Sequence, residues 1–225
     1  EVRYVTKLMD HDLKISIGPK FVLNALHPQA YDAYKNSNDL ELIVKRWQNH
    51  ELDSITKGGK GSKGKFNTNV SIMTPIKPML AKKVSNLTEC FKKSPKGLFA
   101  EIKYDGERIQ IHKDGKDFKC FSRNLKPVQE WKVKDVYGYI EKAAPKAESI
   151  ILDGELLLMD VKTHTPLPFG TLNVHKKNDF EEATVCVFIF DICYLNGEVL
   201  LTTPIEERRK IMLKHVNVIP DHVEV

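Results

Sequence analysis

The stretch Leu98–His112, L-F-A-E-I-K-Y-D-G-E-R-I-Q-I-H, predicts two β-strands joined by a tight turn. Its first part alternates in polarity, so Glu101 and Lys103 are expected on one face of a strand that ends at Lys103. Asp105-Gly106 is a strong turn signal, because glycine tolerates the positive φ of a two-residue hairpin. The residues after it, up to His112, alternate again. We therefore expect a β-hairpin with Lys103 beside its turn.

Lys103 has surroundings that suit a nucleophile. Free lysine titrates near ~10.4 and is almost wholly protonated at neutral pH. Burial or a neighbouring cation lowers that pKa and frees the lone pair of the amine. Arg108, just across the turn, is also suited to gripping phosphate or ribose oxygens. The alternative is an ordinary exposed hairpin with surface ion pairs.

Elements on both sides of the hairpin predict an α+β domain. Ile150–Met159 and Val185–Phe190 are expected strands, the second apolar throughout and hence buried on both faces. Thr203-Pro204-Ile205-Glu206 resembles a capping box with proline at the first helical position, which predicts a helix to about His215. Phe121-Ser122-Arg123-Asn124 closes another short strand. Strands mixed with helices in this way indicate the α+β class.

Asp153-Gly154-Glu155 places carboxylates inside an otherwise apolar strand. A buried carboxylate is costly unless it is paired or bound to a metal. A single carboxylate such as Glu155 suits Mg²⁺, which keeps most of its waters and binds substrate phosphates. The alternative for Glu155 is the solvated face of an edge strand. Phe188-Ile189-Phe190-Asp191 ends the most apolar strand and offers a ring to a base, with Phe188 expected in the core.

The first part of the chain has a different texture. Leu40, Ile43, Val44 and Trp47 share one helical face, and Asn38 with Glu41 resembles a capping box. A lysine-glycine stretch without acidic or apolar side chains follows, which predicts a flexible linker. We therefore expect a helical segment over 1–55, a linker over 56–66 and an α+β domain over 67–225.

Composition excludes several classes of protein. Hydrophobic residues make up 41% of the sequence, enough for a packed core, and the net charge of +5 is a mild excess. No apolar run approaches the ~20 residues that cross a bilayer. The four cysteines form no C-x-x-C pair and have no histidine at zinc-finger spacing. We expect an intracellular, reducing location and no structural zinc.

Four motifs, K-Y-D-G-E-R, F-S-R-N, L-D-G-E and F-I-F-D, occur in the order and spacing of the covalent nucleotidyltransferases. Within that superfamily the chain resembles the eukaryotic ATP-dependent DNA ligases, most of all the type III ligases and their poxviral relatives. The flanks T-K-L-M-D-H-D-L-K, N-A-L-H-P-Q-A-Y-D-A-Y, T-P-I-K-P-M-L-A and P-L-P-F-G-T-L-N-V-H-K-K add to the resemblance.

The resemblance implies a role for six residues. Lys103 matches the lysine that becomes linked to AMP, and Glu101 matches the carboxylate that reads the adenine amino group. Arg108 and Arg123 match arginines near the ribose, the phosphates and the nick. Glu155 corresponds to a metal-site carboxylate, and Phe190 to the ring that stacks on adenine. The expected cofactors are ATP and Mg²⁺.

The resemblance also implies the remaining expectations. The helical segment would be the end of a DNA-binding domain, and the α+β part an incomplete adenylation domain without the later motifs and the oligonucleotide-binding barrel. The expected activity is sealing of nicks in duplex DNA, in repair, recombination and replication. A repair scaffold partner and a nuclear, or also mitochondrial, location follow by analogy. The alternatives are a capping guanylyltransferase or RNA ligase, and a non-catalytic DNA-binding module.

Overall fold

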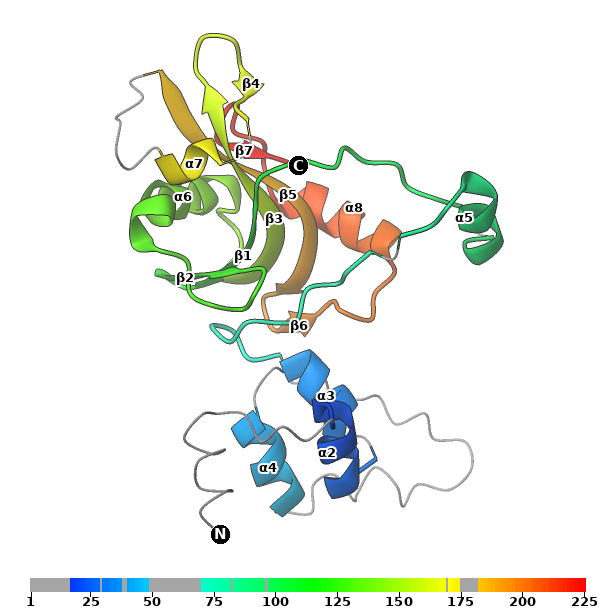
Figure 1. Ribbon diagram of the computed structural model, residues 1–225. Coiled ribbons are helices and arrows are strands. Elements are labelled where there is room, and N and C mark those ends of the chain that lie inside the picture. The colour runs from blue at the N-terminus through cyan, green and yellow to red at the C-terminus, as the bar shows by residue number, and fades with distance from the viewer. Residues whose placement is uncertain are drawn as a thin grey trace, which may run out of the picture. The chain divides into compact units, whose positions relative to one another are not determined.

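The computed structural model describes residues 17–28, 30–37, 40–48, 70–81, 83–95, 97–168, 170–174 and 182–225. They fall into two compact units, one within 1–68 and the other within 69–225. Figure 1 shows short helices in the first and a sheet with helices in the second. The predicted linker and Asn38, the predicted cap residue, lie outside the described residues.

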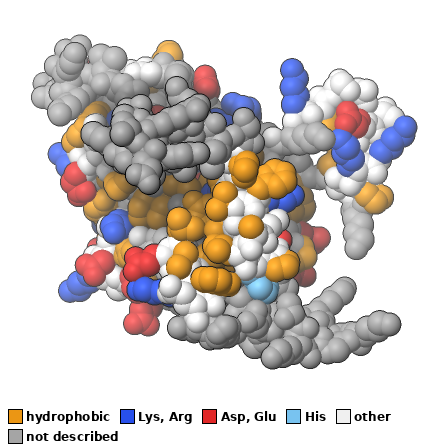
Figure 2. Space-filling model, turned by 60° about the horizontal axis from the view of Figure 1, so that its bottom comes forward, with side chains coloured by type: hydrophobic (Ala, Val, Ile, Leu, Met, Phe, Trp, Pro, Cys, Tyr) orange, Lys and Arg blue, Asp and Glu red, His pale blue; other side chains and the backbone are white. Residues whose placement is uncertain are grey.

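In the first unit the described residues form three helices, α2 (Pro19–Leu26), α3 (Ala30–Ser37) and α4 (Leu40–Gln48). Helix α2 begins as its sequence predicts, because Pro19 occupies a first-turn position where no backbone N–H is needed. The core of the unit is small and consists of Leu23, Ala30, Ala33 and Ile43. The predicted face of α4 is buried only at Ile43, since Leu40 is 53% and Trp47 42% exposed. Figure 2 shows hydrophobic side chains gathered in the middle of the face that it presents.

The second unit is built on one sheet. Its strands are β1 (Glu107–Asp114), β2 (Asp117–Ser122), β3 (Ser149–Asp160), β4 (Thr165–Pro166), β5 (Ala183–Leu195), β6 (Glu198–Val199) and β7 (Val223–Glu224). The main order is β2-β1-β3-β5-β6, with β4 on β3 and β7 on β5. All pairs are antiparallel except β5 with β7. The α+β class is therefore confirmed, and the sheet is mainly antiparallel.

The helices that the structure describes in this unit are α5 (Leu87–Lys93), α6 (Glu130–Ala143), α7 (Thr171–Val174) and α8 (Ile205–His215). Helix α6 contributes Val133, Val136 and Ile140 to the main core, which it shares with the apolar side chains of β1, β3 and β5 on one face of the sheet. Helix α5 buries none of its residues. None of the helices among the described residues has the length and apolarity needed to cross a membrane.

The opposite face of the sheet has a different cover. At one end, segment 70–76 lies on it, with Ile76 packed against Ile151 and Cys193. At the other end, Tyr104 packs on a cluster that includes Leu157 and Phe188. Asp153 and Glu155 lie at alternate positions of β3 between Ile151 and Leu157, so their side chains are on this face between the two apolar clusters.

The predicted hairpin at Asp105-Gly106 is wrong. Residues 97–105 form no strand, and β1 begins at Glu107. The reason is that both edges of β1 are already occupied, by β2 on one side and β3 on the other. The turn that does follow β1 is Asp114–Asp117, where Gly115 has a φ of +57°. An alternating pattern therefore gave the wrong element where no sheet edge was free to pair with it.

Two other details differ from the sequence predictions. Helix α8 begins at Ile205, with Pro204 as its N-cap and no side-chain cap from Thr203. Strand β3 is central in the sheet, so the edge-strand alternative for Glu155 is wrong. The other predicted strands hold, and residues 186–189 of β5 are buried as expected.

Candidate active site

Lys103 lies on the segment that leads into β1, and its side chain is exposed. Gly106 brings this segment against the sheet. A Cβ atom built on Gly106 would stand 2.5 Å from the carbonyl oxygen of Leu156 and 3.0 Å from Cγ of Glu155. Only glycine allows the backbone to approach β3 this closely. Glycine is thus needed here for close approach, and not for the positive φ that the sequence prediction assumed.

Glu155 is the carboxylate that faces this segment from β3. It is half-buried, and burial raises the pKa of its carboxyl above the ordinary value. Three groups oppose that shift: the backbone N–H of Gly106, which donates to the carboxylate, and the charges of Arg108 and Lys103. Glu155 therefore lies within the electrostatic reach of both predicted cations, on the exposed middle of the sheet.

Arg108 is fixed by two charge-assisted hydrogen bonds. Its Nε donates to Oδ1 of Asp153 at 3.0 Å, and its Nη2 donates to Oδ2 at 2.7 Å. Nη2 also donates to the carbonyl oxygen of Met79 at 3.4 Å. This bidentate geometry defines the direction of the guanidinium, which is how arginine gains precision over lysine.

The charges of this pair are maintained in spite of burial. Burial works to lower the pKa of Arg108, but the hydrogen bonds and the charge of Asp153 outweigh it and raise that pKa. Burial likewise raises the pKa of Asp153, and Arg108 opposes that shift. The guanidinium cannot lose its proton under ordinary conditions, so the charged pair is the state that the geometry supports.

Phe190 lies beside Arg108. The guanidinium carbon is 5.3 Å from the centre of the Phe190 ring, within range of a cation–π contact. Phe188, two residues earlier, is almost buried, as the sequence predicts, and its ring centre is 4.1 Å from that of Tyr104. Strand β5 thus presents two rings: Phe188 contacts Tyr104, and Phe190 contacts Arg108.

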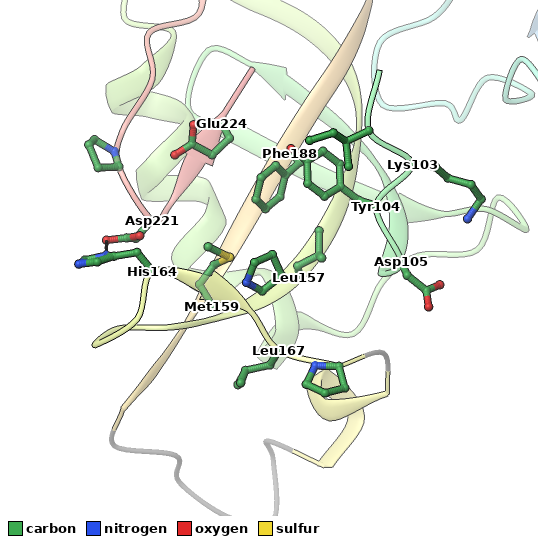
Figure 3. Close-up of a pocket in the computed structure, with 14 residues that line it drawn as sticks. Lys103, Tyr104, Asp105, Leu157, Met159, His164, Leu167, Phe188, Asp221 and Glu224 are labelled. Atoms are coloured by element: carbon green, nitrogen blue, oxygen red, sulfur yellow. Dashed lines mark hydrogen bonds and ion pairs between the residues drawn. The ribbon is translucent and has the colours of Figure 1, made fainter. Parts of the chain in front are cut away.

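A cavity of about 970 Å³ lies next to the Lys103 segment. Figure 3 shows Tyr104 and Phe188 facing one another beside its floor, formed by Leu157 and Met159, while the side chain of Lys103 points away from them. At the far rim, Nδ1 of His164 lies 2.8 Å from Asp221. The cavity is therefore mainly apolar, and Lys103 is among the residues that line it.

The structure brings four of the six predicted residues together, namely Lys103, Arg108, Glu155 and Phe190. Glu101 and Arg123 are exposed, and neither makes a hydrogen bond or ion pair with any described residue. Glu101 does not share a strand face with Lys103, because residues 97–105 form no strand. Arg123 follows the end of β2, as predicted.

Sequence reasoning missed the partners of the charged site residues. Asp153 holds Arg108, and Asp191 is held in turn by Arg208 of α8. The signal was present, because Asp153 and Asp191 both interrupt apolar strands, and a buried carboxylate requires a cationic partner. The sequence alone does not say which arginine supplies it.

Comparisons with known proteins identify the family of the chain. A family model for the ATP dependent DNA ligase domain matches residues 78–225. DNA ligase 3 of Dictyostelium discoideum is 48% identical over 260 residues, which cover 100% of this chain and 22% of that protein. The DNA ligase of Vaccinia virus (strain Western Reserve) is 43% identical over 223 residues, covering 99% of this chain and 38% of the relative.

The chain therefore spans well under half the length of these relatives. Among solved structures, the ligase domain of LigD from M. tuberculosis aligns with 51% of this chain and 35% of that chain, at 22% identity and a TM-score of 0.40. The family model covers most of the chain and contains all six predicted site residues. The resemblance to type III and poxviral ligases is confirmed by the two relatives, and the chain belongs to the ATP-dependent DNA ligase domain family.

Proposed function

We propose that the protein carrying this chain is an ATP-dependent DNA ligase that seals nicks in duplex DNA through a lysyl-AMP intermediate. The observation that carries this proposal is the placement of Glu155 on the sheet where Arg108 is held by Asp153 and where Gly106 brings the Lys103 segment against β3. Family membership supports it. The helical unit is proposed to bind the sugar-phosphate backbone of duplex DNA, without reading the base sequence.

In the proposed first step, the Lys103 amine attacks the α-phosphorus of ATP. A nitrogen–phosphorus bond forms, the bond to pyrophosphate breaks, and the amine loses its proton. Arg108, held by Asp153, stabilises charge that develops on phosphate oxygens at little cost in reorganisation. Phe190 offers its ring to the adenine. The 5′-phosphate at the nick then attacks the AMP phosphorus, which forms a phosphoanhydride and breaks the bond to Lys103. The 3′-hydroxyl finally attacks the 5′-phosphorus, which forms the phosphodiester bond and releases AMP.

We propose Mg²⁺ as the metal and Glu155 as its protein ligand. No group of three metal-binding side chains occurs among the described residues. One half-buried carboxylate with one N–H donor suits a metal that is held mostly by water and by substrate phosphates. The metal would neutralise phosphate charge during transfer. We also propose that Glu101 reads the adenine amino group and that Arg123 contacts the sugar and the nick phosphate, as the family match implies.

Lys103→Arg tests the proposal in the full-length protein. Arginine keeps the positive charge but cannot deprotonate, so transfer of labelled AMP from ATP should be abolished. The adduct on the wild type should be labile in acid and stable in base, as expected for a phosphoramidate. Lys116→Arg, an identical change at an exposed turn, is the control and should adenylate normally. AMP on a peptide without Lys103 would contradict the proposal.

A further inference from the structure

Four buried or half-buried charges form a continuous row across the second unit. Arg108 on β1 pairs with Asp153 on β3, and Asp191 on β5 pairs with Arg208 on α8. Asp153 and Asp191 are register partners on neighbouring strands. The exposed fractions of the four side chains are 19%, 6%, 13% and 8% in that order. The row connects the candidate active site to a helix that contributes none of the residues proposed for catalysis.

The two carboxylates in the centre of the row oppose one another. Like charges directly across a strand pair are unfavourable, and in a buried position water screens them little. The buried negative charge of each carboxylate is therefore tolerated only while its own arginine neutralises it. Removing either arginine leaves two carboxylates to compete for the one that remains.

Arg208 is shaped for this role. Its Nε donates to Oδ1 of Asp191 at 2.7 Å, its Nη2 donates to Oδ2 at 2.9 Å, and Nη1 donates to the carbonyl oxygen of Thr203. The donors of the Arg208 guanidinium are thus directed to the carboxylate of Asp191 and to the carbonyl of Thr203, although the rest of α8 is mostly exposed. The neighbouring Arg209 makes no such contact with any described residue.

From this arrangement we infer that Arg208 is a positioning residue for nucleotide transfer: by neutralising Asp191, it leaves Asp153 free to hold Arg108 in its direction toward the substrate. The inference rests on the proposed function, because the action of Arg108 on ATP belongs to that proposal. Arg208 itself touches neither the lysine segment nor the proposed nucleotide site. Its effect reaches them through Asp191 and Asp153.

Three variants of the full-length protein test the inference, with adenylation of Lys103 by labelled ATP as the readout. Arg208→Gln leaves Asp191 without its cation, so Arg108 is drawn from its position. The KM for ATP should rise by about 10- to 100-fold, because the displaced guanidinium loses its charge-assisted hydrogen bonds to the ATP phosphates. Arg208→Lys loses the two parallel hydrogen bonds to Asp191 but keeps a neutralising cation beside it, so its KM for ATP should rise much less than that of Arg208→Gln, by about threefold.

The double variant Asp191→Asn/Arg208→Gln separates charge balance from simple loss of structure. It has no carboxylate left to compete with Asp153, so it should recover most of the ATP affinity that Arg208→Gln loses. Thermal unfolding of each variant shows that the assays are made on folded protein. If Arg208→Gln does not fold, the double variant and Arg208→Lys still decide the question.

A folded Arg208→Gln protein with the wild-type KM overturns the inference. So does a folded double variant whose KM for ATP is raised as far as in Arg208→Gln, or more than tenfold above wild type. Arg209→Gln is the control, because this residue lies next to Arg208 on α8 without its contacts. Absence of any lysyl-AMP in the wild type and in this control would instead refute the proposed function.

Discussion

Gly106 lies so close to β3 that a Cβ atom on it would stand 2.5 Å from the carbonyl oxygen of Leu156. A Cβ atom is fixed to the backbone and the carbonyl oxygen is part of it, so the contact can be relieved only if one of the two backbone segments moves. The distance between the Lys103 segment and Glu155 is therefore set by the absence of a side chain at residue 106.

Gly106→Ala should push the segment away from the sheet and remove the N–H that Glu155 accepts. We expect adenylation to slow by about 10- to 100-fold, as for other displacements of roughly 1 Å at a reacting group. The measurement is single-turnover formation of lysyl-AMP. Gly138→Ala is the matched control, because a Cβ there meets nothing within 4 Å. It lies within α6, so it should keep activity and gain about 0.5–1 kcal/mol of stability.

Tyr104 is a second residue that connects the Lys103 segment to the sheet, through Phe188 of β5. Its ring contacts that of Phe188, and Tyr104→Ala should release the segment and slow adenylation by about tenfold, since the aromatic contact contributes roughly 0.5–1.5 kcal/mol beyond burial. Tyr104→Phe keeps the ring and should adenylate like the wild type. Equal loss in the two variants would show that the hydroxyl, and not the ring, matters.

His112 joins segment 70–76 to β1 in its neutral form. Its Nδ1 accepts the N–H of Met73 at 3.1 Å, and its Nε2 lies 2.9 Å from Oε1 of Gln110, which also accepts the N–H of Ile76 at 2.7 Å. Burial, together with the charge of Lys119, lowers the pKa of His112 to about 3. Protonation would remove the acceptor that Met73 uses.

The stability contributed by neutral His112 is complete above its ordinary pKa of 6.5 and should be lost as the pH falls toward 3. In that range the unfolded chain takes up a proton that the folded one refuses, at about 1.4 kcal/mol per pH unit. Urea unfolding at several pH values should show this slope in the wild type. In His112→Gln the slope should be smaller by about that amount, whereas identical slopes would contradict the interpretation.

The sequence predicted elements that depend on a local pattern of apolar residues. It was ambiguous where an element or a charged side chain needs a partner from a distant part of the chain. The apolar runs around Ile150 and Val187 could only be strands, and both are. The alternation before Lys103 met no free edge, because β2 and β3 already flank β1. Likewise, the motifs identify Arg108 and Glu155, but only the fold shows that Asp153 holds one and that the Gly106 backbone reaches the other. The row that ends at Arg208 joins positions 100 residues apart, beyond the reach of any spacing rule.

Glu101 gives the last prediction, which concerns the choice of nucleotide. Its carboxylate is exposed and makes no hydrogen bond or ion pair with any described residue, so it is available to accept from a ligand. A carboxylate accepts from the amino group of adenine but repels the carbonyl oxygen that guanine carries at the same position. Glu101→Gln supplies an amide that can also donate, so it should weaken the use of ATP and narrow the preference for ATP over GTP. Bound nucleotide would cover this carboxylate, and a covered polar group left unmatched costs about 1–3 kcal/mol, which corresponds to roughly a 5- to 150-fold change in selectivity. The measurement is the ratio of kcat/KM for lysyl-nucleotide formation with the two triphosphates.

Glu107→Gln, on β1, is the control: its carboxylate is bound by Lys132 of α6, so the ratio should stay as in the wild type. An unchanged ratio in Glu101→Gln would mean that another group recognises the base.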